Sequence, residues 1–190
     1  MAWLALVFFF GGPFWQTKAP ADWTLDELKQ LLTDSPWAQM VSAPDGSMAP
    51  AVQVYFATAP PIEQAERQWD SKKPRKTEPP EDYLTWLNEN RANEIVVAVA
   101  VGGSAAFSDE REIREMEKDC VMRVGRKKYK IDGHFPPSPD DPYLRLAFPR
   151  AVKAADKTVS FDFYLPGVAI PFREAEFQVK DMIVDGKLEM

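Results

Sequence analysis

Glu94-Ile95-Val96-Val97-Ala98-Val99-Ala100-Val101 is the stretch of sequence that decides the fold. After Glu94 it contains only valine, isoleucine and alanine, and the β-branched residues among them favour extended backbone. A strand that is apolar on both faces belongs in the interior of a protein, with other elements covering each face. The sequence therefore predicts that residues 94–101 form the central strand of a buried sheet.

The positions of proline indicate where other regular elements can form. The seventeen prolines run from Pro13 to Pro171, but none falls between Glu81 and Phe135. Because proline disrupts the interior of helices and strands, long regular elements are expected in that window and shorter ones on either side of it.

Helix signals concentrate in the first half of the chain. Thr24 and Glu27 have the spacing of a capping box, and Trp23 and Leu28 that of a hydrophobic staple, so a helix should begin at Thr24. This helix should end before Pro36, where Ser35 could cap a second short turn. The other elements expected here are a strand at 51–58 and helices from about residue 60, from about residue 81 and at 108–118.

Strand signals dominate the second half. Short apolar or alternating runs end at glycine, proline or aspartate, and Asp185-Gly186 is a favoured two-residue turn for a tight hairpin. Strands are expected at 121–124, 127–131, 143–148, 158–165, 172–180 and, as the hairpin, 182–188. Helices in the first half packed on a mostly antiparallel sheet from the second half define an α+β fold.

Length and composition fit one such domain. With 190 residues, 45% of them hydrophobic, the chain can bury a substantial core, and residues 13–190 are expected to form a single α+β domain. The net charge of -6 argues against general binding of nucleic acid, which relies on lysine and arginine. The single cysteine, Cys120, excludes an internal disulfide.

The first twelve residues resemble a targeting signal more than part of a fold. The apolar run from Ala2 to Phe10 ends at Gly11-Gly12 and matches the core of a secretory signal, and it is shorter than the ~20 residues of a membrane-spanning helix. It predicts export to the periplasm or beyond, with membrane contact through residues 1–12 if they are not cleaved. The alternative is a buried strand or helix in a cytoplasmic protein. No lipoprotein anchor is expected, because the lipid would need a cysteine directly after the apolar run and the only cysteine is Cys120.

Candidate catalytic residues are few. His134, the only histidine, enters a proline-rich loop that also holds Asp140 and Asp141, so a hydrolase using His134 with either aspartate is one hypothesis. Solvated loop charges are the simpler interpretation. A Cys120/His134 nucleophile pair is conceivable, but a free cysteine between a helix and an apolar strand is usually a small buried hydrophobe.

No motif indicates a metal or a cofactor. A lone histidine and a lone cysteine do not have the spacing of metal ligands. The glycines at Gly102-Gly103-Ser104 match neither a dinucleotide-binding nor a phosphate-binding loop. We therefore expect neither a metal nor a cofactor.

Two of the tryptophans are candidate binding residues. Trp23, Trp69 and Trp86 lie on or beside apolar helix faces and are expected in the core. Trp15 and Trp37 lie next to helix boundaries, so each could cover the sheet or contribute to a surface for a partner.

Several short segments resemble a group of small uncharacterised exported bacterial proteins. These segments are Phe14-Trp15, Trp23, Leu32 to Ala38, Phe148-Pro149-Arg150, Lys157-Thr158-Val159, Phe177 to Met182 and Gly186 to Glu189. In that group the Phe-Trp pair tends to follow a signal peptide directly. The resemblance implies export and a single domain, and it implies no activity and no site.

The sequence thus favours a non-catalytic, exported binding or interaction protein with a protein partner in the cell envelope. One alternative is the hydrolase that uses His134 with Asp140 or Asp141. The other is an accessory subunit of a membrane-associated assembly that retains residues 1–12.

Overall fold

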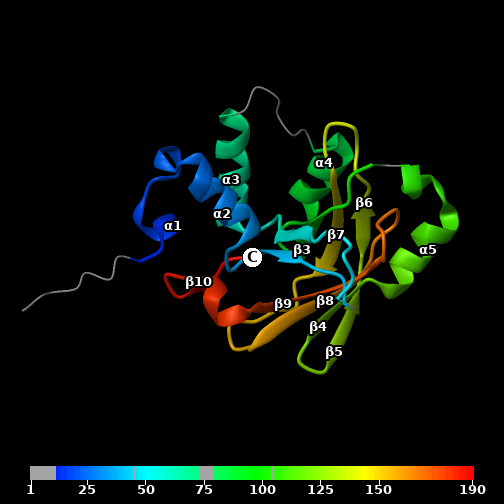
Figure 1. Ribbon diagram of the computed structural model, residues 1–190. Helices are drawn as coiled ribbons and strands as arrows, with labels where there is room; N and C mark the ends of the chain where they lie inside the picture. The colour runs from blue at the N-terminus through cyan, green and yellow to red at the C-terminus, as the bar shows by residue number, and fades with distance from the viewer. Residues whose placement is uncertain (1–11, 45, 73–78, 104) are drawn as a thin grey trace, which may run out of the picture.

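A computed structural model describes residues 12–44, 46–72, 79–103 and 105–190 (Figure 1). The signal-like segment, apart from Gly12, lies outside the described residues. The chain has an α+β fold, as the sequence predicts, with most of its helices in the first half.

The run 94–101 forms the middle of a five-stranded antiparallel sheet, which we call sheet A. Its strand order is β1 (Ala38–Val41), β2 (Val52–Phe56), β3 (Glu94–Ala100), β7 (Tyr143–Pro149) and β6 (Gly133–Phe135). Residues 95–99 of β3 have no solvent exposure, because both faces of the sheet are covered. The predicted central strand is thereby confirmed.

A second antiparallel sheet, sheet B, comes from the second half of the chain. It contains β5 (Lys127–Lys130), β4 (Val121–Val124), β8 (Thr158–Tyr164) and β9 (Phe172–Gln178), in that order. Along β9 buried and exposed residues alternate strictly, so one face of the sheet is in the core and the other is solvated.

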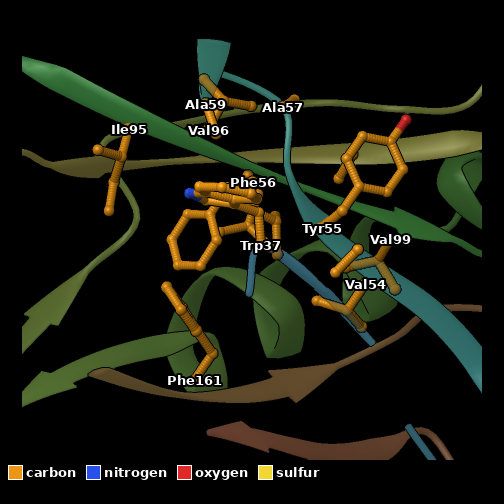
Figure 2. Packing of buried hydrophobic residues seen from close by; sticks show 14 of the residues in the cluster. Trp37, Val54, Tyr55, Phe56, Ala57, Ala59, Ile95, Val96, Val99 and Phe161 are labelled. Atoms are coloured by element: carbon orange, nitrogen blue, oxygen red, sulfur yellow. The ribbon is translucent and has the colours of Figure 1, made fainter. Parts of the chain in front are cut away.

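Aromatic side chains fill the space between the two sheets (Figure 2). The ring centroid of Phe56 on β2 lies 5.6 Å from that of Phe161 on β8 and 4.8 Å from that of Phe177 on β9. Phe148 on β7 lies 5.2 Å from Phe161. Sheet B therefore packs face to face against one of the two faces of sheet A.

Helices cover the opposite face of sheet A. In Figure 1, α3 (Pro60–Ser71) and α4 (Glu81–Asn90) lie on one side of β3 and β7, and sheet B lies on the other. Consecutive residues of a strand point to opposite faces of the sheet. On β2, Phe56 faces sheet B, so its neighbour Tyr55 faces the helices, and the Tyr55 hydroxyl donates a hydrogen bond to Glu66 of α3.

The N-terminal helices pack beside this layer. In α2 (Leu25–Thr33) the predicted capping box is present, with the Glu27 amide donating to the Thr24 hydroxyl and the Thr24 amide to the Glu27 carboxylate. The remaining elements are α1 (Phe14–Thr17), α5 (Glu110–Asp119), the short hairpin β10 (Ile183–Val184) and β11 (Lys187–Leu188), and 3-10 turns at Pro20–Asp22, Ala105–Ser108 and Val179–Met182.

The structure differs from the sequence prediction at the two edges of sheet A and at the start of α5. Strands β1 and β6 were not expected, and each lies at an edge of sheet A. The short turn predicted at Ser35 is present: the Ser35 hydroxyl accepts from the Trp37 amide, and the chain then enters β1. Helix α5 is capped by Asp109, whose carboxylate accepts from the Arg111 amide, and not by Ser108. Among the described residues, no helix combines the length and apolarity needed to cross a membrane.

Candidate functional site

His134 lies on β6, at the edge of sheet A. It pairs across the strands with Leu146, and its Nδ1 atom is 3.7 Å from the Glu117 carboxylate of α5. Together with Asp132 and Gly133, these side chains line a small polar hollow. His134 is therefore one partner of a surface ion pair when it is protonated.

The two aspartates of the hydrolase hypothesis have different surroundings. Asp140 is exposed, whereas Asp141 is completely buried and forms an ion pair with Arg145 of β7. Because Arg145 pairs with Phe135 and Leu146 pairs with His134, Arg145 and His134 project from opposite faces of sheet A. The structure thus does not bring His134 and Asp141 together.

The two candidate tryptophans belong to one aromatic cluster. Trp37 is completely buried, and its indole N–H donates to the backbone carbonyl of Glu189. Trp15 is half-buried, with its ring centroid 6.0 Å from that of Trp37 and 5.0 Å from that of Phe14. Trp37 is therefore a core residue and no part of a partner surface, and Trp15 fixes α1 to the domain.

Cys120 is also a core residue. Its side chain has no solvent exposure, and burial raises the pKa of its thiol to about 12. A thiol with so high a pKa is a poor nucleophile near neutral pH.

A cavity of about 280 Å³ lies between sheet A and the helices α3 and α4, and none of the sequence candidates lines it. We call it the α3–α4 cavity. Its walls combine aromatic rings, aliphatic side chains and a few charged groups from all three elements. They include Tyr55, Tyr83, Tyr143, Trp69, Leu32, Ala57, Leu84, Leu87, Glu63, Glu66, Arg67, Asp70, Arg91 and Arg145.

Glu66 supplies a carboxyl group to this cavity from α3. The Tyr55 hydroxyl donates a hydrogen bond of 2.7 Å to its Oε1 atom. Burial raises the pKa of Glu66 to about 7, although the positive charge of Arg145 opposes the shift. Glu66 therefore changes its charge near neutral pH, unlike an ordinary surface glutamate.

Arg145 supplies a permanent positive charge on the sheet side. Besides its ion pair with Asp141, its guanidinium carbon lies 4.8 Å from the centroid of the Tyr83 ring and 5.8 Å from that of the Tyr143 ring. Burial lowers the pKa of Arg145, but Tyr55, Asp141 and other nearby groups raise it more, so the net shift is upward. Within the described residues its Nε atom finds no hydrogen-bond partner.

The tyrosines of the cavity are neutral near pH ~7. Burial raises the pKa of both Tyr83 and Tyr143 to about 12. The Tyr143 hydroxyl donates to Gln53 over 3.2 Å, and its ring centroid lies 5.2 Å from that of Tyr55. At the rim, Glu63 of α3 and Arg91 next to α4 form an ion pair that links the two helices.

This arrangement is that of a small-molecule site: aromatic and aliphatic walls, few polar groups, and one carboxyl group with a strongly perturbed pKa. In the described ranges, no group of three or more His, Cys, Asp or Glu side chains is placed to hold a metal ion.

Sequence reasoning missed this site, but two signals for it exist. Glu66 follows Ile62 by four residues and so interrupts the apolar stripe of Ile62, Ala65 and Trp69 on one helix face. Arg145 stands within the otherwise apolar strand 143–148. A charged residue on a face that must be buried requires a partner or a function.

Comparisons with known proteins do not identify the chain: no protein-family model, curated protein or solved structure matches it. The resemblance to small exported bacterial proteins thus stays a prediction. The geometry of the α3–α4 cavity is the basis for a functional proposal.

Proposed function

We propose that this chain is an exported, non-catalytic binding protein that takes a small organic ligand into the α3–α4 cavity. The observation that carries the proposal is the carboxyl group of Glu66, which lines an aromatic-walled cavity and is held there by Tyr55. A charged group in such surroundings costs free energy, and proteins keep such groups mainly where they serve a function.

The cavity has the size and lining that suit a ligand. Its volume of about 280 Å³ is near the lower end for ligand pockets, which span roughly 300–1,000 Å³. Leu84 and Leu87 of α4 offer apolar surface opposite the polar groups on α3 and β7. A ligand with an apolar body and one polar end would match both sides.

The hydrolase alternative lacks support in this geometry. A reaction with His134 as base needs an aspartate within hydrogen-bonding reach of it. Asp141 instead pairs with Arg145 on the opposite face of sheet A, and the acidic side chain that lies within 4 Å of the His134 ring among the described residues is Glu117.

A rim-blocking variant tests the ligand site. Leu84 lines the cavity and is 44% exposed, so Leu84→Trp narrows the entrance without changing the core. Leu25→Trp is the matched control, because Leu25 is 51% exposed on α2 and does not line the cavity. We expect fragments found by ligand-observed NMR with the wild-type protein to lose binding in Leu84→Trp and to keep it in Leu25→Trp. An absence of hits, or equal binding to both variants, would overturn the proposal.

Export is tested separately, by fractionation. The signal-like segment predicts that the full chain reaches the periplasm or medium of its host, whereas a chain that begins at Phe14 stays in the cytoplasm. If both chains fractionate identically, the export proposal is wrong. Recovery of the full chain in the membrane fraction would instead favour the accessory subunit of a membrane-associated assembly.

A further inference from the structure

We infer that the ligand of the α3–α4 cavity carries a positively charged amino group, which binds the Glu66 carboxylate while aromatic rings surround it. This inference rests on the proposed function and adds the chemical class of the ligand. It follows from the balance of charges in the cavity and from the nature of its walls.

Three of the other charged groups that line the cavity, Arg145, Glu63 and Arg91, are held in ion pairs. Arg145 forms its ion pair with Asp141. Glu63 forms its ion pair with Arg91 at the rim. Glu66 has no such ion pair among the described residues. Its hydrogen-bond donor there is the neutral Tyr55 hydroxyl, and the positive charge of Arg145, which already pairs with Asp141, stabilises the carboxylate only in part, since its pKa remains raised.

An ionised carboxylate with one neutral donor is costly in such surroundings. Two events can relieve the cost: the carboxyl can take up a proton, or a cation can bind beside it. A ligand ammonium group does the second and also donates N–H hydrogen bonds, which are stronger when both partners are charged. The cavity therefore favours a cation over a neutral or anionic ligand.

The aromatic walls favour the same class. Cations are attracted to the faces of tyrosine and tryptophan rings. The Arg145 guanidinium lies over Tyr83 and near Tyr143, which demonstrates that this wall accommodates positive charge. The rings of Tyr55 and Trp69 line the same cavity as Glu66.

The apolar part of the lining indicates that the remainder of the ligand, apart from its amino group, is apolar. Leu32, Ala57, Leu84 and Leu87 contribute no polar side-chain atoms. An amine on a compact hydrocarbon or aromatic body would place its ammonium at Glu66 and its body against these side chains. An anion would instead meet the carboxylates of Glu63, Glu66 and Asp70, with Arg67 and Arg91 as its cationic contacts toward the rim.

Three probes of similar shape and different charge test the inference: phenethylamine, 2-phenylethanol and phenylacetate. Binding is measured by calorimetry at about pH 8, where a primary amine is protonated and Glu66 is mostly ionised. We expect the amine to bind about tenfold or more tightly than the alcohol, because it forms a charge-assisted hydrogen bond. Phenylacetate should bind most weakly of the three.

Two variants identify the group responsible. Glu66→Gln keeps an oxygen that can accept from Tyr55 but removes the charge, so the amine should lose about tenfold in affinity while the alcohol is unaffected. Glu89→Gln is the matched control, because Glu89 is exposed on α4 and does not line the cavity. It should change the affinity of neither probe.

The outcomes separate this inference from the proposed function. If the alcohol or phenylacetate binds as tightly as the amine, or if Glu66→Gln leaves amine binding intact, the ligand class is wrong while the cavity remains a binding site. If none of the probes binds at millimolar concentration, the cationic class is again overturned. The fragment screen with Leu84→Trp then decides whether the cavity binds any ligand at all.

Discussion

Replacing Glu66 by glutamine should make the protein more stable above neutral pH. The wild-type protein must hold an ionised carboxylate in the α3–α4 cavity, where Tyr55 is its neutral hydrogen-bond donor. Glutamine has nearly the same shape, retains an acceptor for that hydroxyl and never ionises. The substitution therefore removes a cost that the folded state bears and the unfolded chain does not.

The size of the effect follows from the pKa of Glu66. Burial raises it from the ordinary 4.5 to about 7, against the opposing charge of Arg145, while Asp141 and Asp70 add smaller upward contributions. A difference of about 2.5 pKa units corresponds to roughly 3 kcal/mol at ~1.36 kcal/mol per unit. Because Glu66 keeps partial contact with solvent, about 2–3 kcal/mol is the expected gain.

The sign follows from proton linkage. When the folded-state pKa of an acid is raised, the folded state binds the proton more tightly, so stability is lost as the pH rises from 4.5 to about 7. The advantage of Glu66→Gln should therefore be small near pH ~4, grow through this window and be complete above ~7. Glu94, whose pKa burial also raises to about 7, is present in both proteins and cancels in the difference.

Urea unfolding of both proteins across this pH range, followed by circular dichroism, measures the difference. For a chain of 190 residues it corresponds to a rise of about 5–10 °C in Tm above pH ~7. Glu89→Gln is the control, because Glu89 is exposed and does not line the cavity. A stability difference that is constant with pH, or that favours the wild type above neutral pH, would refute the reasoning.

Three further predictions concern the core. Trp37→Ala should cost about 3–5 kcal/mol in urea unfolding, since Trp37 is completely buried and bonded to Glu189; a Tm change of a degree or two would contradict this. Asp141→Asn should cost about 3–5 kcal/mol, because it leaves the buried Arg145 charge without its counterion. A double-mutant cycle with Arg145→Met should show strong coupling, and additive effects would argue against the pair. Cys120 should react with a thiol reagent only after unfolding, and fast labelling of the native protein would show that it is accessible.

The parts of the fold that the sequence predicts are those whose signals are local. The capping box at Thr24 is formed within one helical turn, and the turn at Asp185-Gly186 brings both residues to positive φ angles of 50° and 79°. Strand β3 is recognisable from its uninterrupted apolar run. Strands β1 and β6 were missed because they are short edge strands whose pairing depends on β2 and β7, which the sequence alone does not position.

The candidate site was harder to predict, because burial decides its chemistry. Glu66 and Arg145 are charged residues within otherwise apolar segments, so each can be recognised in the sequence. That they lie close together depends on α3 lying across β2 and β7, which the sequence alone does not show. From the sequence alone, Asp141 is either a solvated loop charge or a catalytic group. Its actual role, the counterion of Arg145, depends on the path of the loop between β6 and β7.

The central claim is that the α3–α4 cavity holds a carboxyl group poised for a cationic ligand. The most direct test is a pH titration of the side-chain carboxyl carbons by ¹³C NMR, with the Glu66 signal assigned by its loss in Glu66→Gln. We predict a midpoint near 7 for Glu66 in the free protein, moving to lower pH when phenethylamine is added, because a bound cation stabilises the carboxylate. A midpoint near the ordinary value of 4.5 in the free protein would contradict the account.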